Sequence, residues 1–165
     1  MKLAELMQGM NPNPTFEGQT TADDMVLAVN LVPGNAPGNF QSYVVAQVQI
    51  NEHSGSLEAQ TVDTQYIRAG EVTTKTGTTR SITVSGDRYV GDEFQDLMLS
   101  HEIKFGTGNA VRKSYVYFSV LSGIGENGEA TVVIDEDAAG AAGENLSFSA
   151  TLTSTMTPAE YAFGA

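Results

Sequence analysis

One stretch of the chain, residues 78–100 (TTRSITVSGDRYVGDEFQDLMLS), constrains the fold most strongly, because its hydrophobic period changes in the middle. In the first half, Arg80, Ile82 and Val84 share one face. The opposite face carries only small hydroxyl side chains, those of Thr79, Ser81, Thr83 and Ser85. A period of two is typical of a half-buried β-strand. The sequence therefore predicts a strand whose outer face is short and uniformly polar.

The second half of the same stretch predicts one short amphipathic helix. Phe94, Leu97 and Met98 recur at the spacing that places side chains on one helical face. Asp92 is a favourable N-cap residue, and Gln95 three positions later completes a pattern similar to a capping box. We therefore expect the three apolar residues to pack this helix onto the sheet.

The last predicted strand, residues 145–155, repeats the pattern of the first. Its inward positions are Leu146, Phe148, Ala150 and Leu152. Its outward positions are again hydroxyl residues, namely Ser147, Ser149, Thr151, Thr153 and Thr155. Exposed strands usually include Lys, Glu or Arg, so two faces made of Ser and Thr alone favour a smooth wall that binds nothing strongly. The alternative is that Thr and Ser are present only because they suit strands.

The remainder of the chain indicates one mainly β domain with an arm at each end. Gly, Ser and Thr are abundant and charged residues make up only 17%, a composition that suits β structure better than a helical bundle. We expect an N-terminal arm over 1–22, the β domain over 23–155 and a C-terminal arm over 156–165. Further strands are predicted at 25–32, 43–50, 57–67, 101–105, 111–121 and 130–134. The connections are predicted at 33–39, 51–56, 68–77, 122–128 and 135–144.

Charge and composition exclude several functions. The formal net charge is −12 and the pI is near 4.3, with every Lys and Arg at or before Lys113 and seven acidic residues after it. Such a chain is poorly suited to binding nucleic acid by neutralising phosphates, although it is well suited to repelling it. The alternative is that the charge serves solubility alone. The chain has no cysteine, no signal-peptide pattern and no apolar run near the ~20 residues of a membrane helix.

The sequence offers no catalytic, metal or cofactor site. The two histidines, His53 and His101, lie beside no nucleophile motif. The acidic run Asp135-Glu136-Asp137 with Glu144 does not have the spacing of an EF-hand loop. We therefore expect a protein that is not an enzyme and needs no cofactor.

The serial order of these motifs resembles the major tail tube proteins of long-tailed bacteriophages, over roughly residues 40–160. The resemblance rests on a hairpin at 43–67 with the exit VDTQYIRAG, on GDRYVGDEFQDLML after the central strand, on EIKFGTG leading into SYVYFSVL, and on the final strand LSFSATLTSTMTP. The loop at 33–39 does not match the family pattern.

The resemblance implies two packed antiparallel β-sheets, sandwich-like or barrel-like, flanked by one short helix. Six copies would form a ring, and stacked rings would form a hollow tube through which double-stranded DNA passes without specific binding. It implies a self-assembling virion tail protein, put together in the bacterial host cytoplasm, with tape-measure, tail terminator and baseplate hub proteins as partners and no membrane association. Channel-lining positions are expected among Thr79, Ser81, Thr83, Ser85, Ser147, Ser149, Thr151 and Thr153. Arg68, Glu71 and Lys75 are expected where rings stack.

Two other functions remain open at this point. One is a different virion component, a decoration or adaptor protein built on a similar sandwich. The other is a carbohydrate-binding β-sandwich module, which the absence of tryptophan disfavours because such sites usually present exposed aromatic side chains.

Overall fold

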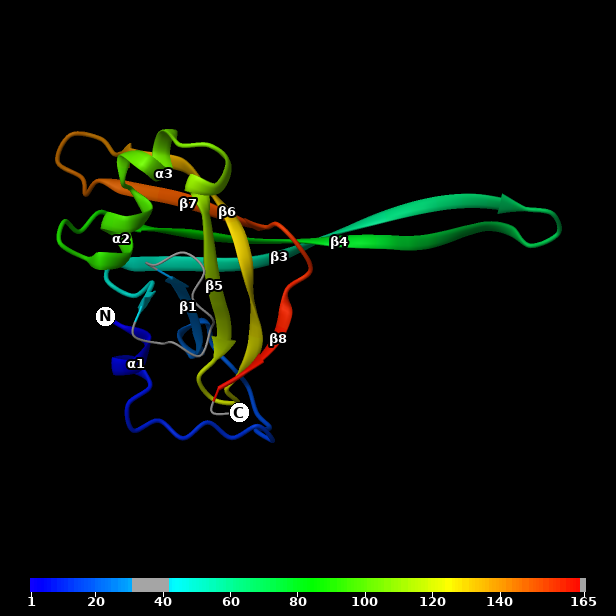
Figure 1. Cartoon of the computed structure of the whole chain (residues 1–165), viewed down its shortest axis with the longest axis horizontal. Helices are drawn as coiled ribbons and strands as arrows, with labels where there is room; N and C mark the ends of the chain where they lie inside the picture. The colour runs from blue at the N-terminus through cyan, green and yellow to red at the C-terminus, as the bar shows by residue number, and fades with distance from the viewer. Residues whose placement is uncertain (31–41, 164–165) are drawn as a thin grey trace.

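The structure is a computed structural model that describes residues 1–30 and 42–163. The predicted loop at 33–39 lies outside the described residues. Figure 1 shows a β body from which one long hairpin projects, with the short helices gathered around the body. Among the described residues, no helix has the length and apolar character needed to cross a membrane.

The described elements are mostly strands. In chain order they are α1 (Leu3–Leu6), η1 (Ala22–Asp24), β1 (Met25–Asn30), β2 (Tyr43–Val45), β3 (Ile50–Tyr66), β4 (Gly70–Asp87), α2 (Glu93–Met98), α3 (His101–Phe105), η3 (Gly108–Val111), β5 (Arg112–Ser119), β6 (Ile124–Ala139), β7 (Ser147–Ser154) and β8 (Ala159–Ala162). The mainly β, antiparallel class predicted from the sequence is confirmed.

The strands form one continuous hydrogen-bonded path in the order β2-β1-β5-β6-β7-β4-β3, with β8 added to β6. Strand β6 joins the two halves of this path, because it pairs with β5 from Gly125 to Thr131 and with β7 from Ala130 to Ala139. The half containing β3, β4 and β7 crosses the half containing β1 and β5 in Figure 1. The two layers are therefore parts of one bent sheet, which is not closed into a barrel.

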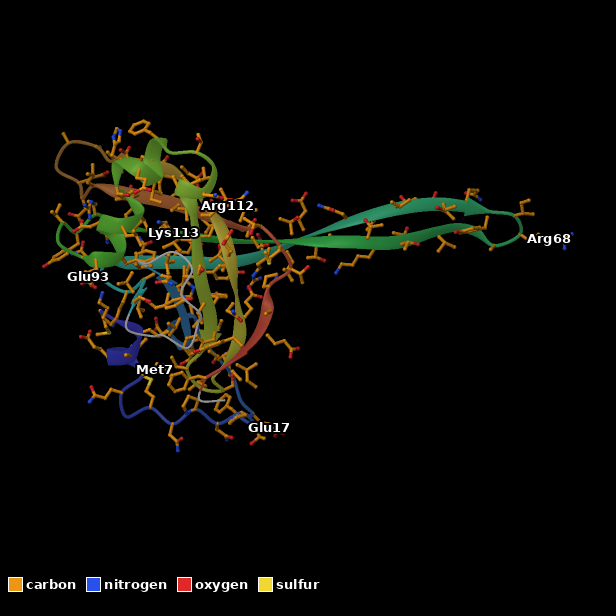
Figure 2. All side chains as sticks on the ribbon, in the orientation of Figure 1. Met7, Glu17, Arg68, Glu93, Arg112 and Lys113 are labelled. Carbon is orange, nitrogen blue, oxygen red and sulfur yellow. The ribbon has the colours of Figure 1, made fainter. Side chains whose placement is uncertain are left out.

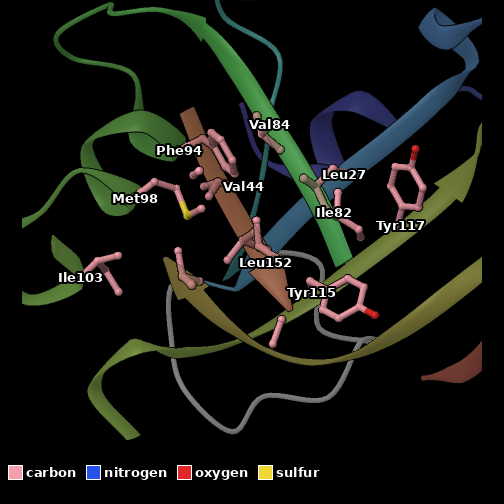
Figure 3. Packing of buried hydrophobic residues seen from close by; sticks show 14 residues of the cluster. Leu27, Val44, Ile82, Val84, Phe94, Met98, Ile103, Tyr115, Tyr117 and Leu152 are labelled. Atoms are coloured by element: carbon pink, nitrogen blue, oxygen red, sulfur yellow. The ribbon is translucent and has the colours of Figure 1, made fainter. Parts of the chain in front are cut away.

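The main core lies between these two halves and the helices (Figure 3). Leu27 and Tyr115 from one half share a buried cluster with Ile82 and Leu152 from the other. Alternation places these side chains on one face of each strand, so the two halves bury a common apolar interior. Burying a large apolar side chain contributes roughly 1.5–3 kcal/mol, which makes this cluster the main source of stability.

A second buried cluster covers the opposite face of β1 and β5. Leu3 of α1 and Tyr161 of β8 pack there with Val116 and Phe118, and Leu3 and Phe118 are fully buried. The ring centroids of Phe118 and Tyr161 are 5.3 Å apart in an edge-to-face arrangement. The two terminal segments that the sequence suggested as arms thus contribute side chains to the packing of the body.

The predicted hairpin over 43–67 is wrong, and the predicted turn at 51–56 and connection at 68–77 are wrong with it. Strand β2 ends at Val45 and pairs with β1, while β3 runs without interruption from Ile50 to Tyr66 and pairs with β4. The real hairpin turns between Tyr66 and Gly70, where Arg68 has a φ of 65° and Gly70 a φ of 75°. Its outer part packs against no core, so its sequence has no inward-facing apolar alternation to detect.

Three further expectations are wrong. The segment predicted as a strand at 101–105 is helix α3, in which Ile103 alone is buried. Strand β6 covers Ile124–Ala139 and so includes most of the turn expected at 122–128 and half of the loop expected at 135–144. The acidic end of β6 is held by backbone pairing with β7 rather than by apolar burial.

Candidate assembly surfaces

One face of the β3-β4-β7-β6 half carries small hydroxyl side chains in registered rows. Ser81 of β4 pairs with Thr153 of β7, Thr83 pairs with Thr151, and Ser85 pairs with Ser149. Directly opposed residues of an antiparallel pair project on the same side of the sheet. Six of the residues expected on the channel therefore share one face, which we call the hydroxyl face.

The hydroxyl face extends to two strands on which no such face is predicted from the sequence. Ser54 and Ser56 of β3 pair with Thr83 and Ser81, and Thr131 of β6 pairs with Thr153. The serines at alternate positions in HSGS (53–56) indicate this face, although the sequence predicts a turn over 51–56. The other two expected positions lie at the margins: Thr79 pairs with Glu58 near the base of the hairpin, and Ser147 donates a 3.1 Å hydrogen bond to the Ala139 carbonyl.

Acidic side chains border the hydroxyl face. Glu52 pairs with Ser85 on one side, and Glu136 pairs with Ser149 on the other. Asp135 accepts a 2.7 Å hydrogen bond from the Thr151 hydroxyl. The row that contains Ser81, Thr153 and Thr131 ends on β5 at a basic residue, Arg112, which pairs with Thr131. Short neutral side chains framed mostly by carboxylates make a surface that repels polyanions.

The hairpin formed by β3 and β4 projects far beyond the body (Figures 1 and 2). Residues at its tip expose apolar side chains. Ile67 in the turn is 94% exposed. Tyr66, Val62 and Val72 behind it are also exposed, and their register places them on one face of the hairpin. Apolar side chains clustered at the end of a projection usually mark a surface that another molecule covers.

The three residues expected at ring contacts all lie on the outer hairpin. Arg68 occupies the turn, and Figure 2 shows it at the far end of the molecule. Glu71 pairs with Gln65, and Lys75 pairs with Thr61 at a register shift. Glu71 and Lys75 therefore lie on the face of the hairpin opposite Val62 and Tyr66.

A polar cluster holds the base of the hairpin against the body. The Arg80 Nε atom lies 2.6 Å from the Glu126 Oε1 atom, and the guanidinium carbon lies 5.5 Å from the centroid of the Tyr117 ring. The Tyr117 hydroxyl lies 3.4 Å from Nδ1 of His53. Burial, followed by the negative charge of Glu126, raises the pKa of Tyr115 to about 12.

Helix α2 contacts the body end of the hairpin strands, where β3 begins and β4 ends. Phe94 and Met98 are fully buried in the main core, and Leu97 packs against it. The Asp92 carboxylate accepts a 3.1 Å hydrogen bond from the Gln95 backbone N–H, which is an N-cap contact. The buried Gln95 side chain donates to the carbonyls of Val48 and Asp87 at 2.9 and 3.0 Å. The sequence predicted a cap at this helix but not the role of Gln95 in joining two segments.

In the described part of the chain, no group of three or more His, Cys, Asp or Glu side chains has an arrangement suited to a metal ion. The two histidines contact different aromatic side chains. His53 contacts Tyr117, and His101 packs its ring 4.9 Å from that of Phe105. The features with a specific geometry are therefore the hydroxyl face and the hairpin.

Solved structures of similar fold come from gene transfer agent particles and from a contractile injection system. A chain in the tail of an empty gene transfer agent particle, refined with C6 symmetry, aligns with a TM-score of 0.56 at 15% identity, covering 87% of this chain and 100% of that one. A chain of a native gene transfer agent virion aligns with a TM-score of 0.55 at 15% identity over the same shares. A chain of the sheath–tube complex of an extracellular contractile injection system aligns with a TM-score of 0.51 at 10% identity, covering 98% and 99%.

No protein-family model and no curated protein matches the sequence. The chain has the fold of phage tail tube-like proteins, and the resemblance seen in its motifs is confirmed at the level of fold.

Proposed function

We propose that the chain is the structural subunit of a virion tail tube, which assembles as six-membered rings stacked around a channel for DNA. The observation that carries the proposal is the long hairpin: its outer part exposes Tyr66, Ile67 and Val72 to water in the single chain. Ten residues separate Leu57 from Ile67, so the outer hairpin reaches about 33 Å at ~3.3 Å per residue. A projection of that length with an apolar end is suited to contact another subunit.

The hydroxyl face is proposed as the channel wall. Its rows are formed by residues such as Thr83 and Thr151, whose side chains are too short and too weakly interacting to hold a phosphate backbone. The bordering carboxylates of Glu52 and Glu136 would repel DNA that approached the wall. Six copies arranged around an axis agree with the C6 symmetry of the gene transfer agent tail that shares the fold.

The hairpin is proposed as the contact between rings, with Arg68, Glu71 and Lys75 at or near that contact. A head-to-tail interface that does not close produces an open stack, as a tube requires. Tape-measure, terminator and baseplate hub proteins are the partners that a tube of fixed length needs at its lumen and its two ends. The location that follows is the tail of a virion assembled in the bacterial host cytoplasm, and the role is structural rather than enzymatic.

Electron microscopy of the purified chain at high concentration tests the proposal. Long hollow filaments are the expected result, whereas monomers or isolated short rings would favour a decoration or adaptor protein. A matched variant removes residues 61–76 and joins Gln60 to Gly77 through an Asn-Gly turn, which preserves the Gln60–Gly77 register of the inner hairpin. This variant should keep the unfolding transition of the parent chain and lose filament formation.

A further inference from the structure

A pocket of about 300 Å³ opens on the body between the N-terminal segment, β1 and the start of β3. Most of its lining is apolar, including Leu6, Met10, Met25, Ile50 and Val120. Met10 is 42% exposed, and the other four are partly buried. An open apolar hollow of this size holds one or two large side chains.

The pocket and the hairpin tip lie at opposite ends of the same strand. Ile50, the first residue of β3, lines the pocket, and Tyr66, the last, adjoins the turn. Figure 1 shows α1 and the start of β3 on the side of the body away from the hairpin turn, and Figure 2 shows Arg68 far from Met7. When one copy is shifted along the direction of β3, its tip approaches the pocket of the next copy.

The chemistry of the two surfaces is complementary. The tip offers the exposed side chain of Ile67, followed directly by the cation of Arg68. The pocket offers apolar walls, and the exposed carboxylate of Asp23 also lines it. Insertion of the apolar side chain into the pocket would supply most of the affinity. The pairing of the opposite charges beside it would set the orientation of the two copies.

We propose that this pocket is the receptor for the hairpin tip of a second copy, with Ile67 inserted between Met10 and Ile50 and Arg68 paired with Asp23. The inference rests on the proposed tube function and names the surface that the hairpin contacts. The contact is head-to-tail, so each subunit uses its tip once and its pocket once.

Disulfide trapping tests the contact, because the chain has no cysteine of its own. Ile67→Cys combined with Ala22→Cys, an exposed pocket position, should give a ladder of covalent oligomers when assembled filaments are oxidised. The control combines Ile67→Cys with Phe105→Cys, which is 71% exposed on α3. The control should give no ladder, since the proposed contact places the tip of a neighbouring copy at the pocket and not at α3.

Charge reversal provides a second measurement that does not depend on disulfide geometry. Arg68→Asp should raise the critical concentration for filament formation about tenfold, and adding Asp23→Arg should restore it to within about threefold. Filaments that form normally but give no ladder with Ala22→Cys, together with no rescue, would overturn the pocket as receptor and leave tube formation standing. A parent chain that forms no filaments would overturn both proposals.

Discussion

Nε of Arg80 lies 2.6 Å from Oε1 of Glu126, and this pair joins the base of the projecting hairpin to strand β6. Arg80 pairs with Leu57 at the point where β3 and β4 leave the body, while Glu126 lies opposite Tyr117 within the sheet. The side chains are only 16% and 26% exposed. The direction of the hairpin relative to the body therefore depends on a charged contact that is largely shielded from water.

Replacing Arg80 with Met should lower the free energy of unfolding by about 1–3 kcal/mol. The change removes the ion pair and the contact of the guanidinium with the Tyr117 ring, and it leaves the Glu126 carboxylate partly buried without its partner. Urea denaturation of the unassembled subunit measures the effect. Lys104→Met is the control, because the Lys104–Asp137 pair is more exposed and should cost no more than ~0.5 kcal/mol. Equal losses for the two variants would contradict the role assigned to Arg80.

Gln95→Leu should be more damaging and should lower the free energy of unfolding by about 2–4 kcal/mol. The buried amide is the partner of the Val48 and Asp87 carbonyls and accepts a 2.8 Å hydrogen bond from the Tyr89 N–H. Leucine fills similar space but leaves these backbone groups without a donor or acceptor, and a buried unpaired group costs roughly 1–3 kcal/mol. Gln65→Leu on the exposed hairpin is the matched control. Denaturation curves that overlap for the two variants would show that Gln95 is not a structural link.

The parts of the fold that could be predicted are those that contact the core. The alternation of Ile82 and Val84, like that of Phe148 and Leu152, predicted strands because one side of each strand is buried. Helix α2 was predictable for the same reason, from its apolar face and its cap at Asp92.

Of the outer hairpin, the sequence predicted the strand at 57–67 but not its partner strand, because the projecting part packs against no apolar core. From Leu57 to Tyr66 every residue of β3 is exposed, so no inward face constrains the sequence. The two strands are paired by backbone hydrogen bonds, and the order of side chains in the sequence does not reveal this pairing. Helix α3 was misread for a related reason: its five residues bury only Ile103, too little to show a helical period.

The hydroxyl face was predicted in part, on β4 and β7, where it alternates with buried residues.

The proposed role of the hydroxyl face as a channel wall gives a further prediction. Thr83→Lys places a cation in the middle of the hydroxyl rows, so filaments of this variant should retain double-stranded DNA. The retention should fall steeply as the salt concentration is raised. Phe105→Lys adds the same charge on α3 and should retain none in the lumen. Co-sedimentation of DNA with filaments over a range of salt concentrations measures the difference. Equal retention by both variants would place the hydroxyl face outside the channel.

Gly125→Ala should destabilise the subunit by about 1–3 kcal/mol or more. Gly125 lies opposite Phe118, and a methyl group there would overlap the Tyr117 carbonyl and the Phe118 backbone. Gly128→Ala is the control on the same strand, because its nearest neighbour would be the Pro158 Cα atom at an ordinary contact distance of 3.6 Å. Thermal unfolding of both variants gives the comparison. A control as unstable as Gly125→Ala would contradict the close approach of Phe118 as the cause of the loss.

Alkaline pH should unfold the subunit through its buried tyrosines. Burial raises the pKa values of Tyr43 and Tyr161 from 10.0 to about 12, and the pKa of Tyr115 reaches a similar value. The folded chain therefore binds more protons than the unfolded chain between pH 10 and 12. Stability is fully present below pH 10 and decreases as the pH rises through this window.

Urea midpoints measured from neutral to strongly alkaline pH, together with the ultraviolet absorbance of tyrosinate, test this dependence. Tyr43→Phe should leave the midpoint at neutral pH almost unchanged, because the Tyr43 hydroxyl has no hydrogen-bond partner among the described residues. It should also reduce the loss of stability at alkaline pH, because the folded state then has one fewer tyrosine with a raised pKa. Tyr89→Phe, at a position 49% exposed, is the control and should preserve the full loss. If Tyr43→Phe lost stability with pH as steeply as Tyr89→Phe, burial of Tyr43 would not contribute to the alkaline transition.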